Sequence, residues 1–260
     1  MANPMYGQNK IDGKIDDKVT GKKQVFRFGT PPNVSDYEHA AAQLVDGTAG
    51  DTTLHQYNDG LEFTLYPIVG QDIDKPAAST SGMDYGYEQD DDDGIEWRMH
   101  DNTCKGREGI NSFTVGKQAF SATLEFSIED VSGTDDCAFG FAKVEAHAAA
   151  IDNRDESAVL NVISGDIYIE TILNNGTTTA TDTTNNWAND EVHSLGVFVD
   201  KAGAVTYKID GSAPSTTAAF SFDLGEVVTP SFYMLQAADL TGAVIHRKLT
   251  ITSDNGSMEE

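Results

Sequence analysis

The chain has 260 residues, of which 39% are hydrophobic and 9% aromatic, a composition typical of a folded protein rather than a disordered one. Its formal net charge of −25 excludes strong attraction to nucleic acid or to an anionic membrane surface, because like charges repel. No segment approaches the roughly 20 consecutive apolar residues of a membrane span. The opening MANPMYGQNK lacks the apolar core of a secretory signal peptide, so we expect synthesis in the cytoplasm.

The first 23 residues are set apart by their charge. Residues 1–28 carry +3, which leaves −28 on the remainder of the chain. Lysines and β-branched residues each recur at every fourth position, a spacing that would align the apolar ones on one side of a helix. Gly13 and the β-branching weaken a helix, so an extended arm that orders on a partner is an equal alternative. We predict an N-terminal arm, residues 1–23, that binds an acidic partner through Asn3, Tyr6, Lys10, Ile11, Lys14, Ile15, Lys18 and Val19.

Residues 24–45 predict one strand and one helix. Residues 24–28 (QVFRF) are expected to form a short strand closed by the turn sequence GTPPN. Residues 35–45 (SDYEHAAAQLV) begin with Ser35 at an N-cap position and place Glu38 at the matching capping-box position. We therefore expect a single short helix over 35–45.

The following segments predict two strands separated by a long acidic loop. Residues 61–66 alternate apolar and polar side chains, and Pro67 is expected to end this strand. Residues 70–94 are rich in Asp, Gly, Ser and Thr, and a loop of this length inside a compact domain is usually functional or mobile. Residues 95–100 are expected to resume as a strand.

From residue 120 onward the sequence predicts strands almost throughout. Apolar and polar residues alternate over 120–129, the pattern of a strand with one buried and one solvated face. Further strands are expected at 137–143, 158–163, 167–173, 192–199, 205–209, 227–235 and 244–251, and the polar tract 174–186 is expected to be a loop. This pattern predicts an all-β fold, an antiparallel β-sandwich. It would be a single domain over 24–260, with its best-supported core at 120–252.

Residues 187–211, WANDEVHSLGVFVDKAGAVTYKIDG, resemble the central hairpin of concanavalin A-like and laminin G-like jelly-roll domains. Asp200 and Gly203 would close one turn, and Asp210-Gly211 is a hairpin signal for the next. Val192 departs from the pattern, since the family often has Trp there. The resemblance covers about half of the chain and implies the fold rather than an activity. The positions that fit are His193, Val197, Val199, Asp200, Gly203, Val205, Tyr207, Asp210 and Gly211.

The opening MANPMYGQNK is similar to the start of virion proteins of marine tailed bacteriophages that carry this same sandwich. This resemblance implies a structural protein of the virion, most simply a capsid decoration or cement subunit present in many copies. Its arm would attach to the major capsid protein or another virion protein. The alternative is a glycan-binding adhesin or tail-associated receptor-binding module, whose loops bind a surface glycan.

The sequence predicts no enzyme. Glucan hydrolases with the resembling fold carry E-x-D-x-E on one strand, and no such triplet occurs. The nearest pair, Asp166 and Glu170, would lie on one strand face about 13 Å apart. Glycosidase carboxylates lie roughly 5–9.5 Å apart, so this pair is better interpreted as surface carboxylates. Nor does the chain contain G-x-S-x-G or a phosphate-binding loop.

Cofactor motifs are also absent from the sequence. None of the six histidines lies in H-E-x-x-H, and His193 is best interpreted as a packed strand residue. The two cysteines, Cys104 and Cys137, are too few for a disulfide framework, so we expect reduced thiols.

Two binding sites remain open as hypotheses. The carboxylates of Asp90, Asp91, Asp92 and Asp93 could contribute oxygen ligands to calcium, but the DxDxDG spacing is missing and a solvated acidic loop explains them better. The aromatic side chains of Tyr85, Tyr87 and Trp97 flank this loop and could stack on a sugar. Aromatic residues near strands are more often part of the core.

Overall fold

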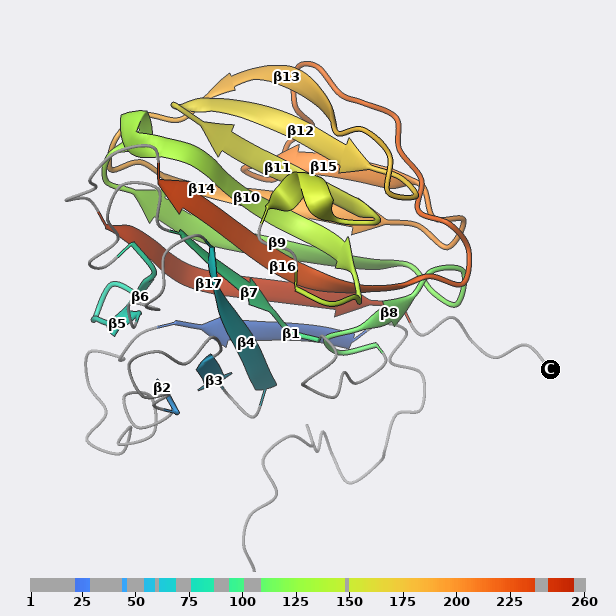
Figure 1. The fold of residues 1–260 in the computed structure, drawn as a ribbon, viewed down its shortest axis with the longest axis horizontal. Coiled ribbons are helices and arrows are strands. Elements are labelled where there is room, and N and C mark those ends of the chain that lie inside the picture. Colours follow the sequence, from blue (N-terminus) through green and yellow to red (C-terminus); the bar gives the residue numbers. More distant parts are fainter. Residues whose placement is uncertain are drawn as a thin grey trace, which may run out of the picture.

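The computed structural model describes residues 22–28, 44–45, 54–58, 61–68, 76–86, 94–100, 109–147, 150–236 and 243–254. Within these residues the secondary structure consists of β-strands and two short 3-10 helices, η1 (Val131–Gly133) and η2 (Ile151–Asn153). None of the described segments is a helix with the length and apolar character needed to cross a membrane. The strands form two antiparallel sheets that face each other (Figure 1).

Sheet A contains seven strands. Along one path they are β15 (Val205–Ile209), β14 (Val192–Val199), β9 (Phe120–Ile128), β17 (Val244–Ser253), β6 (Met83–Asp84) and β5 (Ala77–Ala78), and β1 (Lys22–Arg27) pairs with β17. Because β1 begins at Lys22, this residue and Lys23 belong to sheet A rather than to the predicted arm.

Sheet B contains ten strands. Their order is β13 (Thr179–Asn186), β12 (Asp166–Ile172), β11 (Ser157–Ile163), β10 (Thr134–Lys143), β16 (Val227–Gln236), β7 (Gly94–Arg98), β4 (Leu61–Ile68), β3 (Leu54–Asn58) and β2 (Leu44–Val45), and β8 (Phe113–Thr114) pairs with β16.

One large hydrophobic core fills the space between the sheets. Phe120, Leu124 and Phe126 of β9 are at most 3% exposed, and Val197 and Val199 of β14 are at most 2% exposed. The same cluster includes, from sheet B, Phe139, Phe141, Leu160, Ile169 and Phe232. Every second residue of β9 thus points inward, as the alternation predicts. The all-β antiparallel sandwich is confirmed.

The two-residue turn after β15 is the hairpin signal seen in the sequence. Asp210 and Gly211 have φ values of 50° and 77°, the left-handed conformations of a type I′ turn.

The Asp210 carboxylate is 2.6 Å from Nδ1 of His193, whose Nε2 is 3.0 Å from Glu191. His193 was expected to be simply packed. It is half-buried, lies edge-on to Trp187, and links the two carboxylates beside the hairpin.

The polar tract 174–186 was predicted to be a loop, and this prediction was wrong, since most of it forms the edge strand β13. Its β-branched threonines favour extended backbone even though they are polar. The strand needs no continuous apolar face, because among the described strands it pairs with β12 alone and it is largely exposed. The Thr183 hydroxyl donates a hydrogen bond to the Ile167 carbonyl at 2.5 Å, which fastens the strand to the sheet.

Other boundaries also differ from expectation. Pro67 lies inside β4 rather than ending it, and it is opposite Ile95 of β7. The last described pair between β4 and β3 comes before Pro67, so its missing N–H breaks no described pairing with β3. At the end of the predicted helix 35–45, Leu44–Val45 is strand β2, and the rest of that segment lies outside the described residues. The predicted loop 70–94 contains the short hairpin β5–β6, and its last residue begins β7.

Candidate functional site

A row of side chains crosses the outer face of sheet A at one end of the sandwich. In the strand register, Phe198 lies opposite Thr206 on β15 and opposite Ser121 on β9. Ser121 in turn lies opposite Thr252 on β17. Successive residues of a strand point to opposite faces, and the neighbours of Phe198 on β14 point into the core, so this row points outward.

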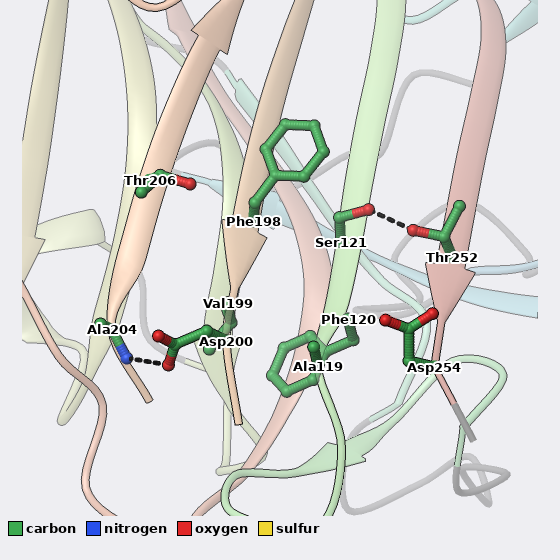
Figure 2. Close-up of a pocket in the computed structure, with 10 residues that line it drawn as sticks. All are labelled: Ala119, Phe120, Ser121, Phe198, Val199, Asp200, Ala204, Thr206, Thr252 and Asp254. Carbon is green, nitrogen blue, oxygen red and sulfur yellow. Dashed lines mark hydrogen bonds between the residues drawn. The ribbon is translucent and has the colours of Figure 1, made fainter. Parts of the chain in front are cut away.

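An open pocket of about 260 Å³ lies along this row (Figure 2). The hydroxyls of Ser121 and Thr252 hydrogen-bond to each other within it. Besides the four residues of the row, the pocket is lined by Ala119, Phe120, Val199, Asp200, Ala204 and Asp254. The pocket therefore combines one half-buried aromatic ring, several hydroxyls and two carboxylates.

The position of the Phe198 ring depends on the glycine two residues before it. A Cβ atom at Gly196 would lie 3.0 Å from Cε2 of Phe198 and 3.0 Å from Oγ1 of Thr123. The missing side chain therefore leaves room for the ring on the sheet surface. Nζ of Lys208, on the neighbouring strand β15, lies 4.8 Å from the ring centroid. This is a cation–π contact.

Asp200 is held at the edge of the pocket by its own turn. Its Oδ1 accepts hydrogen bonds from the backbone N–H groups of Ala202 at 2.8 Å and Ala204 at 2.9 Å. Gly203, with φ of 91°, donates its N–H to the Asp200 carbonyl. These bonds fix the carboxylate and leave Oδ2 without a partner among the described residues.

Asp254 approaches the pocket from the end of β17. Its backbone N–H donates to the Ala119 carbonyl at 2.9 Å, which places the residue beside the start of β9. Figure 2 shows the carboxylates of Asp200 and Asp254 on either side of Ala119 and Phe120. An apolar ring beside two carboxylates and several hydroxyls is an arrangement suited to a small ligand with both C–H and O–H groups.

Tyr85 and Trp97, proposed from the sequence to bind sugar, are not part of this pocket. Tyr85 is 1% exposed and Trp97 is fully buried, so both belong to the core, which corrects the prediction. Both pack around His246: the Tyr85 ring lies 4.3 Å from its ring, and Trp97 Nε1 donates to its Nδ1 at 3.4 Å. The remaining candidate residues, Tyr87, Asp90, Asp91, Asp92, Asp93, Cys104 and the arm residues 3–19, lie outside the described residues. Cys137 is a free, buried thiol.

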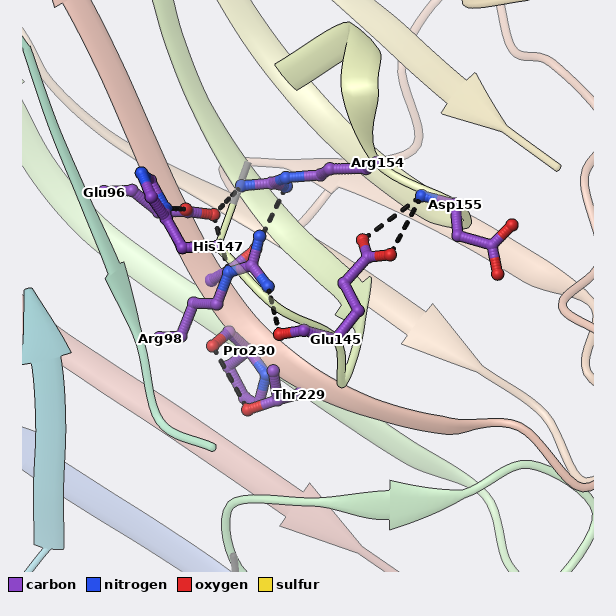
Figure 3. A network of polar contacts seen from close by, with 9 residues as sticks. Glu96, Arg98, Glu145, His147, Arg154, Asp155, Thr229 and Pro230 are labelled. Atoms are coloured by element: carbon purple, nitrogen blue, oxygen red, sulfur yellow. Dashed lines mark hydrogen bonds and ion pairs between the residues drawn. The ribbon is translucent and has the colours of Figure 1, made fainter. Parts of the chain in front are cut away.

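The outer face of sheet B holds a buried ion network beneath the segment that joins β10 to β11 (Figure 3). Glu96 Oε1 accepts hydrogen bonds from Arg98 Nε at 2.8 Å and from Arg154, and all three side chains are at most 1% exposed. Glu96 Oε2 lies 2.7 Å from Nδ1 of His147, which stacks on Tyr66. Burial alone would raise the pKa of Glu96, but the charges of Arg154 and Arg98 hold it at about 2.

A second group of polar residues lies on the same face of sheet B. Asn161 donates from Nδ2 to Asp136 at 2.5 Å and to Glu170 at 3.0 Å. Burial raises the pKa of Asp136 to about 6 and that of Glu170 to about 7. Glu170 is 8% exposed, so its prediction as a surface carboxylate was wrong. Its partner Asp136 comes from another strand, which no linear motif reveals.

The part of the chain that the structure describes contains no group of three or more His, Cys, Asp or Glu residues placed to hold a metal ion. On sheet B, Ile151 of η2 packs against Ile68, Val159 and Tyr233, so the β10–β11 segment covers this part of the outer face. The pocket on sheet A therefore remains the candidate functional site. The sequence signal for it is Phe198, an aromatic residue at an outward position of an alternating strand.

Comparisons with known proteins match the fold. No family model and no curated protein matches the chain. Among solved structures it is similar to the potassium-bound carbohydrate recognition domain of Emp46p (TM-score 0.52, 10% identity, 90% of this chain and 98% of that chain). It is also similar to lectin II from Ulex europaeus (TM-score 0.50, 14% identity, 90% and 98%).

A protein of unknown function from Shewanella oneidensis MR-1 has a similar structure as well (TM-score 0.50, 10% identity, 89% of this chain and 100% of that chain). At these levels of identity the likeness concerns the fold alone. The chain has a concanavalin A-like β-sandwich fold, with lectin-like domains among its structural neighbours.

Proposed function

We propose that this chain is a glycan-binding module whose pocket on the outer face of sheet A receives one sugar ring. The observation that carries the proposal is the row of Phe198, Ser121 and Thr252 beside the carboxylates of Asp200 and Asp254. A pyranose presents C–H groups on one face, which pack against an aromatic ring, and hydroxyls at its edge, which donate to carboxylates.

The size of the pocket suits a small ring. Pockets for drug-sized ligands measure roughly 300–1,000 Å³. The volume here is about 260 Å³, and the pocket is open rather than enclosed. One sugar would occupy it, and neighbouring sugars of a chain would extend over the polar outer face of sheet A.

The structural neighbours support this proposal at the level of the fold. Two of them are described as a lectin and a carbohydrate recognition domain, so the same sandwich serves sugar-binding proteins. The position of the site is argued from the residues of this chain and not from those proteins, because a shared fold does not carry a shared function.

A glycan array followed by an NMR titration of isotope-labelled protein tests the proposal. We expect binding to at least one class of glycan, with the largest amide shifts at Ser121, Phe198 and Asp200. Chain length of the glycans should stay unchanged, since the proposal is binding without cleavage. Shifts centred on Asp136 and Glu170 instead, or glycan cleavage that Glu170→Gln abolishes, would contradict it.

The lysines of the N-terminal arm support a second proposal, attachment of the sandwich to a virion or other particle. Residues 1–28 carry +3 against −28 on the remainder; Lys22, Lys23 and Arg27 lie in β1, whereas Lys10, Lys14 and Lys18 precede it, where an acidic partner would meet them. The comparisons give no support to a phage setting, so this role rests on the sequence alone. Because β1 begins at Lys22, a truncation that removes the arm and keeps β1 intact deletes residues 2–21.

This truncation should leave a folded sandwich that no longer joins its particle. Mass spectrometry of assembled particles would measure the copy number. Lys10→Glu, Lys14→Glu and Lys18→Glu together should weaken attachment, and added salt should weaken the attachment of the parent protein in the same way. Full copy number with the truncated chain would show that the arm is not the attachment element.

A further inference from the structure

The pocket on sheet A is acidic, and this charge determines which glycans it can bind. Of the residues that line it, Asp200 and Asp254 are acidic and none is basic. The whole chain carries a net charge of −25. A uronate or sulfated sugar would therefore meet repulsion both on approach and in the pocket, whereas a cationic sugar would be attracted.

The carboxylate of Asp200 is already positioned to accept a hydrogen bond from a ligand. Two backbone N–H groups hold its Oδ1, so the side chain is already ordered and the ligand does not have to immobilise it. Oδ2 has no donor among the described residues. An ammonium group carries three N–H donors and no acceptor, so it can bond to such an oxygen and still reach a hydroxyl of Ser121 or Thr252.

Phe198 provides a second, independent sign of affinity for an ammonium group. Nζ of Lys208 already lies 4.8 Å from the centroid of its ring, a cation–π contact made by the protein itself. Lys208 is exposed and does not line the pocket. The ring thus already has a cation beside it, so a sugar that packs its C–H face on Phe198 can carry an ammonium group at its edge.

The other charges near the row do not cancel this preference. Lys248 is paired with Glu125 at 2.7 Å, so this pair adds no net charge to the outer face. Lys208 is not the only further positive charge near the row, since Lys201 adjoins Asp200 and Lys23 lies opposite Thr252 in the β1–β17 register. None of these lysines lines the pocket, whose own charged residues are Asp200 and Asp254, both negative.

We propose, on the basis of the function proposed above, that the pocket selects sugars bearing a protonated amine over neutral sugars and excludes anionic ones. The ligand class is an amino sugar with a free amino group, such as a glucosamine residue in a β-1,4-linked chain. The ammonium would bond to Oδ2 of Asp200, with the carboxylate of Asp254 adding negative charge from the other side of the pocket, while the C–H face of the ring packs on Phe198.

Calorimetric titration with three oligosaccharides of equal length and β-1,4 linkage tests this selectivity, because they differ only at C2: glucosamine, N-acetylglucosamine and glucose oligomers. At mildly acidic pH, where the amine is protonated, the glucosamine oligomer should bind at least about tenfold more tightly than the other two. The preference should shrink as salt is added. An oligomer of uronic acid should bind most weakly.

Variants separate charge from shape. Asp200→Asn keeps the oxygen that accepts the turn hydrogen bonds, and with Asp254→Asn it should bring the ratio of glucosamine to glucose affinity toward one. Lys208→Ala should raise that ratio, since it removes the competing cation. Glu129→Gln is the matched control: it removes a carboxylate from just past the far end of the β9 strand and should leave the ratio unchanged.

The outcomes distinguish this inference from the proposed function. Equal affinity for the three oligomers, or a ratio that Asp200→Asn does not change, would overturn the amine selectivity while leaving glycan binding intact. Tightest binding to the uronic acid oligomer would also overturn it. If these oligomers and every glycan on the array fail to bind, the proposed function itself is wrong.

Discussion

Replacing Glu96 with Gln is expected to lower the free energy of unfolding by about 3–5 kcal/mol. Glu96 is the acidic partner of both Arg98 and Arg154, and all three side chains are at most 1% exposed. An amide can still accept one hydrogen bond, but it leaves two buried guanidinium groups with only the half-buried carboxylate of Glu145 as a nearby counter-charge. Breaking one partner of a buried ion group costs far more than the net stabilisation of the intact group. Denaturant unfolding of parent and variant measures the difference.

Glu125→Gln is the matched control for that variant. Glu125 pairs with Lys248 at 2.7 Å, but about a third of each side chain is exposed. A pair of this kind contributes up to about 1 kcal/mol, because water screens the charges in both states. Equal losses for the two variants, or a loss below about 1 kcal/mol for Glu96→Gln, would show that the ion network on sheet B is not a buried one.

Glu170 should make stability decrease as the pH rises from about 4.5 to about 7. Burial raises the pKa of this carboxyl from 4.5 to about 7 in the folded protein, and Asn161 opposes the shift only in part. The unfolded chain releases the proton near pH 4.5, so the folded state binds more protons across this window and loses stability as they leave. The shift corresponds to at most about 3 kcal/mol.

Comparison with Glu170→Gln isolates this effect. The buried His246, whose pKa burial lowers well below 6.5, has the opposite dependence, since its contribution is lost as the pH falls below 6.5. Both proteins share that background. The parent should therefore lose stability relative to the Gln variant as the pH rises, measured by denaturant unfolding at several pH values. A constant difference between them would show that Glu170 is solvated rather than buried beside Asp136.

The sequence was sufficient for the sandwich where alternation was strict. Along β9 each inward residue is apolar and each outward one is polar or small, so its bounds follow directly from a period of two. The same reasoning failed for β13, because an edge strand with a largely exposed surface carries no apolar alternation. There, β-branched Thr residues were the only sign of extended backbone.

The site was harder to predict, for a physical reason. Aromatic residues attract attention as binding residues, yet Tyr85 and Trp97 surround the buried His246 in the core. In the sequence Phe198 does not stand out, because it lies within the apolar run of β14 and only the register shows that it points outward. Pairings such as Phe198 with Ser121, or Asp136 with Glu170 through Asn161, join residues from different strands, which a single sequence does not bring together.

The central claim, that a sugar binds on Phe198, is tested most directly by measuring the affinity of Phe198→Ala for the glycan that binds the parent protein most tightly. We expect a loss of at least about tenfold, equivalent to about 1.4 kcal/mol, with the fold intact because the ring is only half-buried. Val192→Ala is the control: it shortens an apolar, 45% exposed side chain on the same face of the same strand, outside the pocket. Equal affinities for parent, Phe198→Ala and Val192→Ala would contradict the claim.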